Sequence, residues 1–316
     1  MAAPAETVRL PLQRRYAHAR DECVEFNPGP HTYTVTQPKR FPEVVPVSVT
    51  GFSKNYFKQF DGRATVDRYY ERWKASPQSK YYTMIHAALR EELGDEGAKQ
   101  RILVHWASTN DQASRDGTAM HAEAELLCNG MQPAVESPEM AMLRKWLVEW
   151  EPHMAWEPVR TEWILWWEDE RIAGDVLVAG TLDLLMWSKT ADVYALVDFK
   201  RTNPKPKFDG GDRNLLGPST NPRLHPGYAK APLGDLENSA WGQYTMQLNI
   251  LAKMLRERYG IDVKERMYLL QLHPDLDAAH CAKVEAHPKA TDALFAVETI
   301  RRCGEAAEAA EAAAGR

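Results

Sequence analysis

The chain has 316 residues, of which 44% are hydrophobic and 26% charged, and its formal net charge is −5. These values are typical of a soluble globular protein with one large domain or two small ones. They argue against a generally basic nucleic-acid-binding chain, although a local basic patch would be enough for such binding.

No run of the sequence approaches the roughly 20 apolar residues that span a bilayer, and the N-terminus lacks the apolar core of a signal peptide. We therefore expect an intracellular, non-secreted protein without a membrane partner, in the nucleus, the cytoplasm or an organelle. Residues 1–20 carry four arginines and one glutamate, so an organellar transit peptide is an alternative to a loosely attached N-terminus. The four cysteines are widely separated, which favours neither a zinc site nor a disulfide framework.

The first part of the chain predicts a small β-hairpin. Residues 28–30, Pro-Gly-Pro, precede an alternating run at residues 31–35, and a second strand-like run covers residues 45–52. This hairpin carries no evident chemistry. We expect the chain to divide into residues 1–55, an N-terminal appendage with a β-hairpin; residues 56–276, the core; and residues 277–316, a C-terminal helical tail.

Helical patterns follow from residue 61 onwards. Residues 111–129 predict a helix that is interrupted or kinked near Gly117, with His121 and Glu125 one turn apart on one face. A solvated helix face would explain these two polar residues on their own. Residues 138–151 predict an amphipathic helix whose apolar side packs in the core.

A strand is predicted next, over residues 160–167, and it contains Glu162. A salt-bridged surface position is one explanation of this glutamate. The stretch that follows contains two Ala-Gly steps, so Asp175 is an alternative to Asp183 as the acidic residue of the next strand.

Residues 181–187 and 193–200 predict two apolar strands joined by a polar turn, and therefore a β-hairpin. Asp183 interrupts the first apolar run, where an unpaired carboxylate would be costly to bury. Because side chains alternate along a strand, Asp198 and Lys200 point to the same face, and the hairpin can bring Asp183 beside them.

Two adjacent carboxylates repel each other unless a cation lies between them, and hard oxygen ligands suit Mg²⁺ or Mn²⁺. Such a metal can make a water acidic and shield a phosphodiester oxygen, while Lys200 orients that water or stabilises developing charge. The hairpin is therefore a candidate hydrolytic site. A surface hairpin with a salt bridge is the alternative.

A long stretch rich in Pro and Gly separates the hairpin from the next helix. Residues 200–234 contain seven basic and two acidic residues, a net charge of +5 in a chain that is negative overall. This segment is the best candidate for a surface that contacts nucleic-acid phosphates, and a solvated insert is the alternative. The candidate DNA-binding residues are Arg201, Lys205, Lys207 and Arg213.

The remaining elements are a helix, a strand and a tail. Apolar residues at helical spacing predict a helix over residues 237–259, in which Gln247 is a polar exception. Residues 266–272 predict the last strand of the sheet, and the chain from Thr291 predicts a helix with an Ala/Glu-rich end.

Several of these motifs, in this order, resemble the PD-(D/E)xK nuclease superfamily. Gly180 to Asp183 followed by Asp198-Phe199-Lys200 resembles its catalytic hairpin, and G-T-x-x-H-x-x-x-E at residues 117–125 is similar to the helix before that hairpin in the lambda-exonuclease/RecB-like branch. Residues 241–249 resemble the helix whose glutamine faces the active site. Leu251 stands where that branch usually has a tyrosine. The resemblance covers roughly residues 45–275 and extends to nuclease-like proteins of large DNA viruses.

The resemblance implies an α/β fold with a central mixed β-sheet flanked by helices and a restriction-endonuclease-like αβββαβ core. It implies a metal-dependent DNase that uses Mg²⁺ or Mn²⁺, an exonuclease in DNA repair, recombination or replication, with DNA as its partner. Some RecB-like relatives carry an iron–sulfur cluster on cysteines grouped near the C-terminus; that grouping is missing here, so we expect no cluster. Polarity and oligomeric state stay open.

The resemblance also assigns roles to residues. His121, Asp183 and Asp198 are the expected metal ligands, with Glu125 and Glu162 as further candidates. Asp183, Asp198, Lys200 and Gln247 are the expected catalytic residues. Two other functions use the same fold: a structure-specific or RNA-directed endonuclease, and a catalytically silent DNA-binding subunit.

Overall fold

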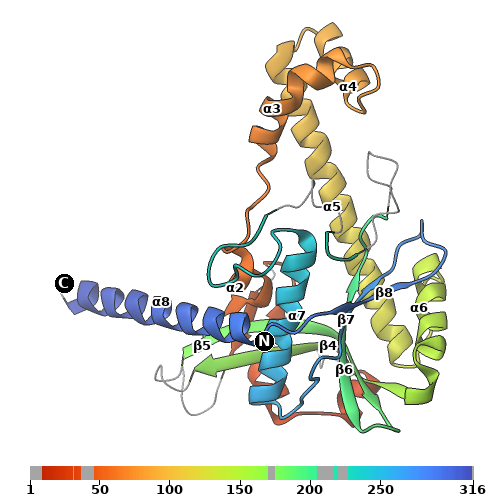
Figure 1. The fold of residues 1–316 in the computed structure, drawn as a ribbon, viewed down its shortest axis with the longest axis vertical. Coiled ribbons are helices and arrows are strands. Elements are labelled where there is room, and N and C mark those ends of the chain that lie inside the picture. The colour runs from red at the N-terminus through yellow and green to blue at the C-terminus, as the bar shows by residue number, and fades with distance from the viewer. Residues whose placement is uncertain are drawn as a thin grey trace, which may run out of the picture. The chain divides into compact units, whose positions relative to one another are not determined.

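The computed structural model describes residues 9–30, 32–36, 46–169, 175–204, 216–219 and 227–314 (Figure 1). The chain divides into two compact units, one formed by Met1–Lys58 with Met120–Arg316 and the other by Gln59–Ala119. This division differs from the three segments expected from sequence, because the N-terminal residues group with the larger unit and residues 59–119 form a unit of their own.

The smaller unit is helical. It consists of α3 (Gly62–Ala75), α4 (Tyr82–Arg90) and the first part of α5 (Gly94–Cys128). Its core is a separate cluster of buried apolar side chains that includes Tyr70 and Ile85. Such a cluster lets α3 and α4, which have 14 and 9 residues, remain folded where their intrinsic helix propensity alone would not.

The expectation of an interruption or kink near Gly117 is wrong, because α5 is one continuous helix of 35 residues. A single glycine in a helix costs only about 1 kcal/mol, and the good helix formers on both sides of it outweigh that cost. The last part of α5, from Met120, belongs to the larger unit and carries His121 and Glu125.

The larger unit is built on a six-stranded mixed sheet. Two strand pairs, β3–β5 and β6–β7, are parallel, and the pairs β4–β5, β5–β6 and β7–β8 are antiparallel. The strands are β3 (Val47–Ser48), β4 (Trp156–Asp169), β5 (Asp175–Ser188), β6 (Val193–Lys200), β7 (Met267–Gln271) and β8 (His280–Val284). The β5–β6 hairpin predicted from sequence is confirmed. The expectation that residues 266–272 form the last strand is wrong, since β8 pairs beyond β7.

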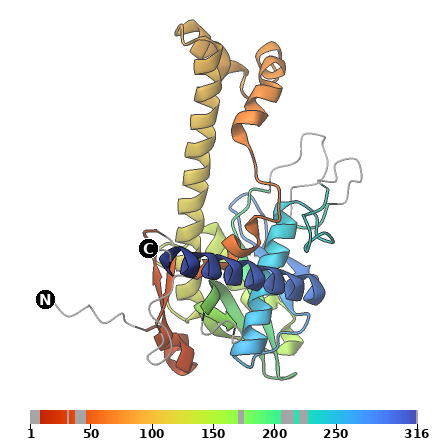
Figure 2. The same ribbon diagram turned by 90° about the vertical axis from the view of Figure 1, so that its left-hand side faces the viewer.

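Helices cover the two faces of this sheet (Figure 1). Side chains of α7 and α8 share one apolar cluster with Leu185 and Leu196 of the sheet, whereas those of α6 and the end of α5 share another with Leu184 and Val197. Figure 2, in which α8 faces the viewer, shows α7 behind it. The helices of this unit are α1 (Pro11–Arg15), α2 (Val49–Lys54), α6 (Pro138–Glu149), α7 (Ala240–Arg258) and α8 (Pro288–Ala314), with short 3-10 turns at Ala19–Cys23 and Pro152–Met154.

These elements confirm an α/β protein with a mixed sheet flanked by helices. From α6 to β7 the chain runs in the order helix, three strands, helix, strand. Among the described residues, no helix combines the length and the apolar character needed to cross a membrane.

The N-terminal residues are fastened to β4 by buried polar contacts. Arg160 and Asp21 form an ion pair of 2.9 Å between side chains that are 3% and 6% exposed, and Trp163 Nε1 donates to the same carboxylate at 2.7 Å. The hairpin of β1 (Val24–Asn27) and β2 (Thr32–Val35) follows this contact. The N-terminal segment is therefore an integral layer of the larger unit.

The strand β5 is forked along one edge. β4 pairs with β5 from end to end, so β3 and β6 share the other edge, where β3 pairs at residues 178–179 and β6 at residues 184–188. Residues 180–183 lie between the two pairings. A Cβ added at Gly180 would lie 2.4 Å from Val49 Cγ2, which explains why the sequence has a glycine where α2 approaches β5.

Candidate metal and hydrolytic site

Asp183 lies at the fork, where β6 begins to separate from β5. Its carboxylate accepts a hydrogen bond of 2.6 Å from the backbone N–H of Phe199. The last backbone pair of the hairpin is Leu184 with Val197, so the Asp183 side chain binds the β6 backbone where the pairing of the two strands ends. The bond is charge-assisted and buried, and it holds Asp183 beside the strand end that carries Asp198 and Lys200.

Asp198 and Lys200 form the second part of the site. Lys200 Nζ lies 2.5 Å from Asp198 Oδ2, and Gln247 of α7 donates from Nε2 to Asp198 Oδ1 at 3.0 Å. The Asp198 side chain is 1% exposed. Alternation along β6 thus presents Asp198 and Lys200 to α7, while Phe199 packs into the cluster formed with α5 and α6.

His121 brings α5 to the same place. Its Nδ1 lies 3.1 Å from Glu162 Oε1 and 3.6 Å from Asp183 Oδ1. One ligand atom from each of these three residues lies within 4.8 Å of the others. A helix, β4 and β5 therefore contribute one imidazole and two carboxylates to a single cluster.

Glu162 has an unusual backbone for a strand residue. It lies between the pairs Thr161–Leu184 and Trp163–Leu182, and so opposite Asp183. Its φ is 41°, in the left-handed region that residues other than glycine rarely adopt. Such a conformation costs about 1–3 kcal/mol and occurs preferentially at functional sites.

The charges of the site influence one another strongly. Burial opposes protonation of His121, but Asp183 and the hydrogen bond to Glu162 outweigh it and raise the pKa of His121 to about 9. Burial raises the pKa of Asp183, and it raises that of Asp198 to about 6, although Lys200 acts in the opposite direction on both. Burial works against the charge of Lys200, but Asp198 more than compensates and raises the pKa of the ammonium.

The donor set fits a divalent cation. Two buried or half-buried carboxylates and an imidazole converge, and carboxylate oxygens are the ligands that Mg²⁺ and Mn²⁺ prefer. In addition, Asp198 Oδ2 is buried without a hydrogen bond of regular geometry, its close partner among the described residues being the Lys200 ammonium. Burial is the main cause of the raised pKa of Asp183, and repulsion by Glu162 adds to it. A cation in the cluster would reduce that repulsion.

Asp198 is thus arranged differently from the other expected ligands. His121 and Asp183 belong to the cluster together with Glu162, which the sequence analysis named as a further candidate. Asp198 is held by Lys200 and Gln247 on the adjacent strand end. Asp175, the alternative to Asp183, is the first residue of β5 and pairs with Asp169.

Glu125 lies beside the cluster. Thr161 Oγ1 lies 3.4 Å from Glu125 Oε1, and burial raises the pKa of this carboxyl. Glu125 and Glu162 both line a polar pocket of about 160 Å³, which Gln13 and Asp21 of the N-terminal segment also line. The N-terminal residues therefore form part of the surroundings of the site.

Of the expected DNA-binding residues, the structure describes Arg201 alone. Arg201 donates from Nε to Glu139 Oε1 at 2.8 Å, and both side chains are largely buried. This pair anchors the end of β6 to α6. Lys205, Lys207 and Arg213 lie outside the described residues.

Two tyrosines near the site were missed by the sequence analysis. The Tyr33 hydroxyl of β2 lies 3.1 Å from Thr181 Oγ1, two residues before Asp183 on the same strand. The Tyr244 ring on α7 lies 4.6 Å from Lys200 Nζ. Tyr244 precedes Gln247 by three residues and so shares its helix face, a spacing that could have identified it; no comparable signal marks Tyr33.

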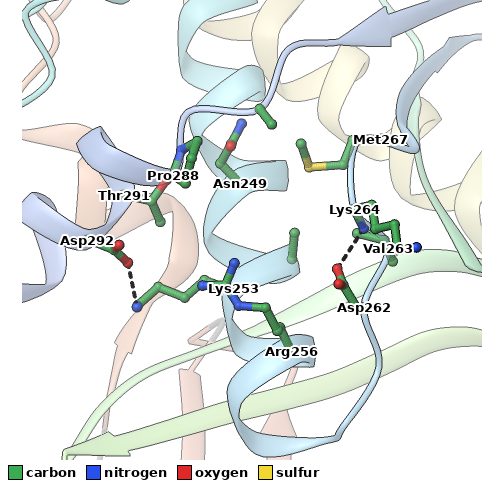
Figure 3. Close-up of a pocket in the computed structure, with 12 residues that line it drawn as sticks. Asn249, Lys253, Arg256, Asp262, Val263, Lys264, Met267, Pro288, Thr291 and Asp292 are labelled. Carbon is green, nitrogen blue, oxygen red and sulfur yellow. Dashed lines mark hydrogen bonds and ion pairs between the residues drawn. The ribbon is translucent and has the colours of Figure 1, made fainter.

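A separate cavity of about 50 Å³ is lined by twelve residues of α7, β7, α8 and the segments next to them (Figure 3). Figure 3 shows Lys253 reaching Asp292, with an ion pair of 2.7 Å. None of the residues that line this cavity belongs to the cluster of His121, Glu162 and Asp183. This cavity is therefore not part of the candidate metal site.

No family model matches the chain, and no curated protein matches it. A solved structure titled "Crystal structure of SSO0001" matches with 12% sequence identity over 77% of this chain and 86% of that chain, at a TM-score of 0.25. A similarity of this size supports no statement about fold or function.

Proposed function

We propose that the protein is a metal-dependent DNase that hydrolyses phosphodiester bonds, with a restriction-endonuclease-like core. The observation that carries the proposal is the convergence of His121, Glu162 and Asp183 beside the Asp198–Lys200 pair. The motif resemblance favours an exonuclease that acts in DNA repair, recombination or replication.

In this proposal His121, Glu162 and Asp183 hold Mg²⁺ or Mn²⁺, with Asp198 at the edge of the same charge cluster. The metal would supply positive charge at the phosphodiester and acidify a water. Lys200 donates hydrogen bonds to the water or to a phosphate oxygen as negative charge develops. Gln247 keeps Asp198 in place, so that the ammonium of Lys200 has a fixed counter-charge.

The test compares purified wild type with Lys200→Ala and Asp183→Ala on linear DNA labelled at the 5′ or 3′ end, single- and double-stranded, and on closed circles and RNA. Each reaction contains Mg²⁺, Mn²⁺ or EDTA. Lys189→Ala is the matched control, because Lys189 is an exposed lysine in the turn of the same hairpin. Folding of each variant is checked by circular dichroism.

We expect metal-dependent loss of linear DNA with circles spared, and a rate at least about a hundredfold lower in both site variants. Cleaved circles would make the enzyme an endonuclease, and cleaved RNA would change the substrate class. Unchanged cleavage by Lys200→Ala or Asp183→Ala would refute the assignment. Binding of DNA by a wild type that cleaves no substrate would favour a silent DNA-binding subunit.

A further inference from the structure

Among the residues that the structure describes, the ammonium of Lys200 has two partners of different kinds. Its Nζ lies 2.5 Å from Asp198 Oδ2 and 4.6 Å from the centroid of the Tyr244 ring. The Lys200 side chain is 15% exposed. A largely buried ammonium on a flexible four-carbon stem needs such partners, because few water molecules can solvate it.

One helix face supplies a contact to each member of the Asp198–Lys200 pair. Tyr244 and Gln247 are three residues apart on α7 and therefore neighbours on its surface. Gln247 donates to Asp198, and the ring of Tyr244 faces Lys200. Packing of α7 against the sheet thus holds the carboxylate of Asp198 through Gln247 and the ammonium of Lys200 through Tyr244.

The ring contact differs from the carboxylate contact in one respect. Asp198 shares its negative charge among Lys200, Gln247 and, in the proposed function, a nearby cation. The face of the Tyr244 ring attracts an ammonium through its quadrupole. The ring is not a ligand for a divalent cation, so it does not compete with the carboxylates and the imidazole for the metal. It would therefore keep Lys200 in place when Asp198 is drawn towards positive charge elsewhere.

We infer that Tyr244 is a positioning residue that holds the ammonium of Lys200 against its ring face for catalysis. The catalytic part of this inference rests on the proposed function, whereas the contact itself does not. The ring, rather than the hydroxyl, carries the role, so phenylalanine can replace tyrosine and leucine cannot.

The first measurement is independent of activity. Lysine labelled with ¹³C at the ε carbon reports the ring through its shielding, and Lys200→Arg identifies the Lys200 resonance in the metal-free protein. We expect a ring-shifted Lys200 resonance in wild type and Tyr244→Phe, and its return to the ordinary lysine position in Tyr244→Leu. An ordinary position in the wild type would overturn the inference.

The second measurement is the cleavage rate. Tyr244→Phe should retain the wild-type kcat, and Tyr244→Leu should lower kcat roughly two- to thirtyfold with KM unchanged. Phenylalanines with one, two or three fluorines at position 244 keep the shape of the ring and weaken its negative face, so kcat should fall stepwise. If the ring at position 244 served only for packing, kcat would not fall stepwise with the number of fluorines.

The outcomes separate this inference from the proposed function. An active wild type whose kcat is insensitive to fluorination would overturn the positioning role and leave the nuclease assignment intact. A wild type without nuclease activity but with a ring-shifted Lys200 would refute the nuclease assignment and support the contact. If Tyr244→Leu fails to fold, the fluorinated series decides.

Discussion

Glu162 lies opposite Asp183 across the β4–β5 pair, and its backbone is left-handed in the middle of a strand. The two carboxylates meet at His121, which approaches both of them. A conformation that costs free energy, next to charges that repel each other, is expected to persist where it serves binding rather than stability.

The strain at Glu162 predicts that glycine at this position stabilises the protein. Glu162→Gly relieves about 1–3 kcal/mol of backbone strain, which exceeds the 0.5–1 kcal/mol that glycine costs through the unfolded chain. We expect a higher free energy of unfolding in urea, measured in EDTA, together with weaker Mn²⁺ binding by calorimetry. Glu157→Gly, in the same strand with an ordinary φ, is the control and should be destabilised. A less stable Glu162→Gly would argue against strain.

Gly180 predicts a steric limit between β5 and α2. An alanine Cβ would lie 2.4 Å from Val49 Cγ2, so Gly180→Ala should lower the free energy of unfolding by about 1–3 kcal/mol. Gly234→Ala is the control, because nothing lies within 4 Å of its added Cβ. Combining Gly180→Ala with Val49→Ala should cost less than the sum of the two single changes. Simple additivity would show that the two residues do not clash.

The buried ion pair of Asp21 and Arg160 predicts that the N-terminal segment is needed for stability. Asp21→Ala leaves Arg160 buried without its carboxylate partner and should lower the free energy of unfolding by roughly 3–5 kcal/mol. Glu22→Ala, next to it, removes a side chain that is 75% exposed and should change stability little. Chemical denaturation measures both. Equal effects of the two variants would contradict this account.

His18 predicts a loss of stability at mildly acidic pH. Burial lowers the pKa of His18 from its ordinary 6.5, the charges of Arg20 and Arg160 act in the same direction, and Asp21 opposes them. The His18 ring nitrogen also accepts a hydrogen bond from the Arg20 backbone N–H, which a protonated nitrogen cannot do.

The folded state therefore binds fewer protons at His18 than the unfolded state does. Its contribution to stability is complete above about pH 6.5 and is lost as the pH falls through the folded pKa. Between pH 7.5 and 5.0 the thermal midpoint of the wild type should fall further than that of His18→Asn, which retains an acceptor. A parallel decline of the two proteins would rule out His18 as the source.

Patterns among residues close together in the chain were enough to predict the β5–β6 hairpin. Alternation along a strand was enough to put Asp198 and Lys200 on one face, and the apolar run around Asp183 was enough to mark that residue as unusual. Helical spacing likewise predicted a helix over residues 237–259 in which Gln247 is a polar exception. The same local rules predicted a kink at Gly117 that α5 does not have, because helix propensity is a weak preference that the rest of a long helix overrides.

The sequence by itself therefore determined the β5–β6 hairpin and the placement of Asp198 and Lys200 on one face, since these depend on residues close together in the chain. Only the tertiary structure decided that His121 meets Glu162 and Asp183, that Glu162 is left-handed, that Tyr244 contacts Lys200, and that the N-terminal segment is fastened to β4. The physical reason is that these contacts join residues tens to more than a hundred positions apart. Packing of the apolar faces of helices and sheet brings such residues together, and no local periodicity encodes that arrangement.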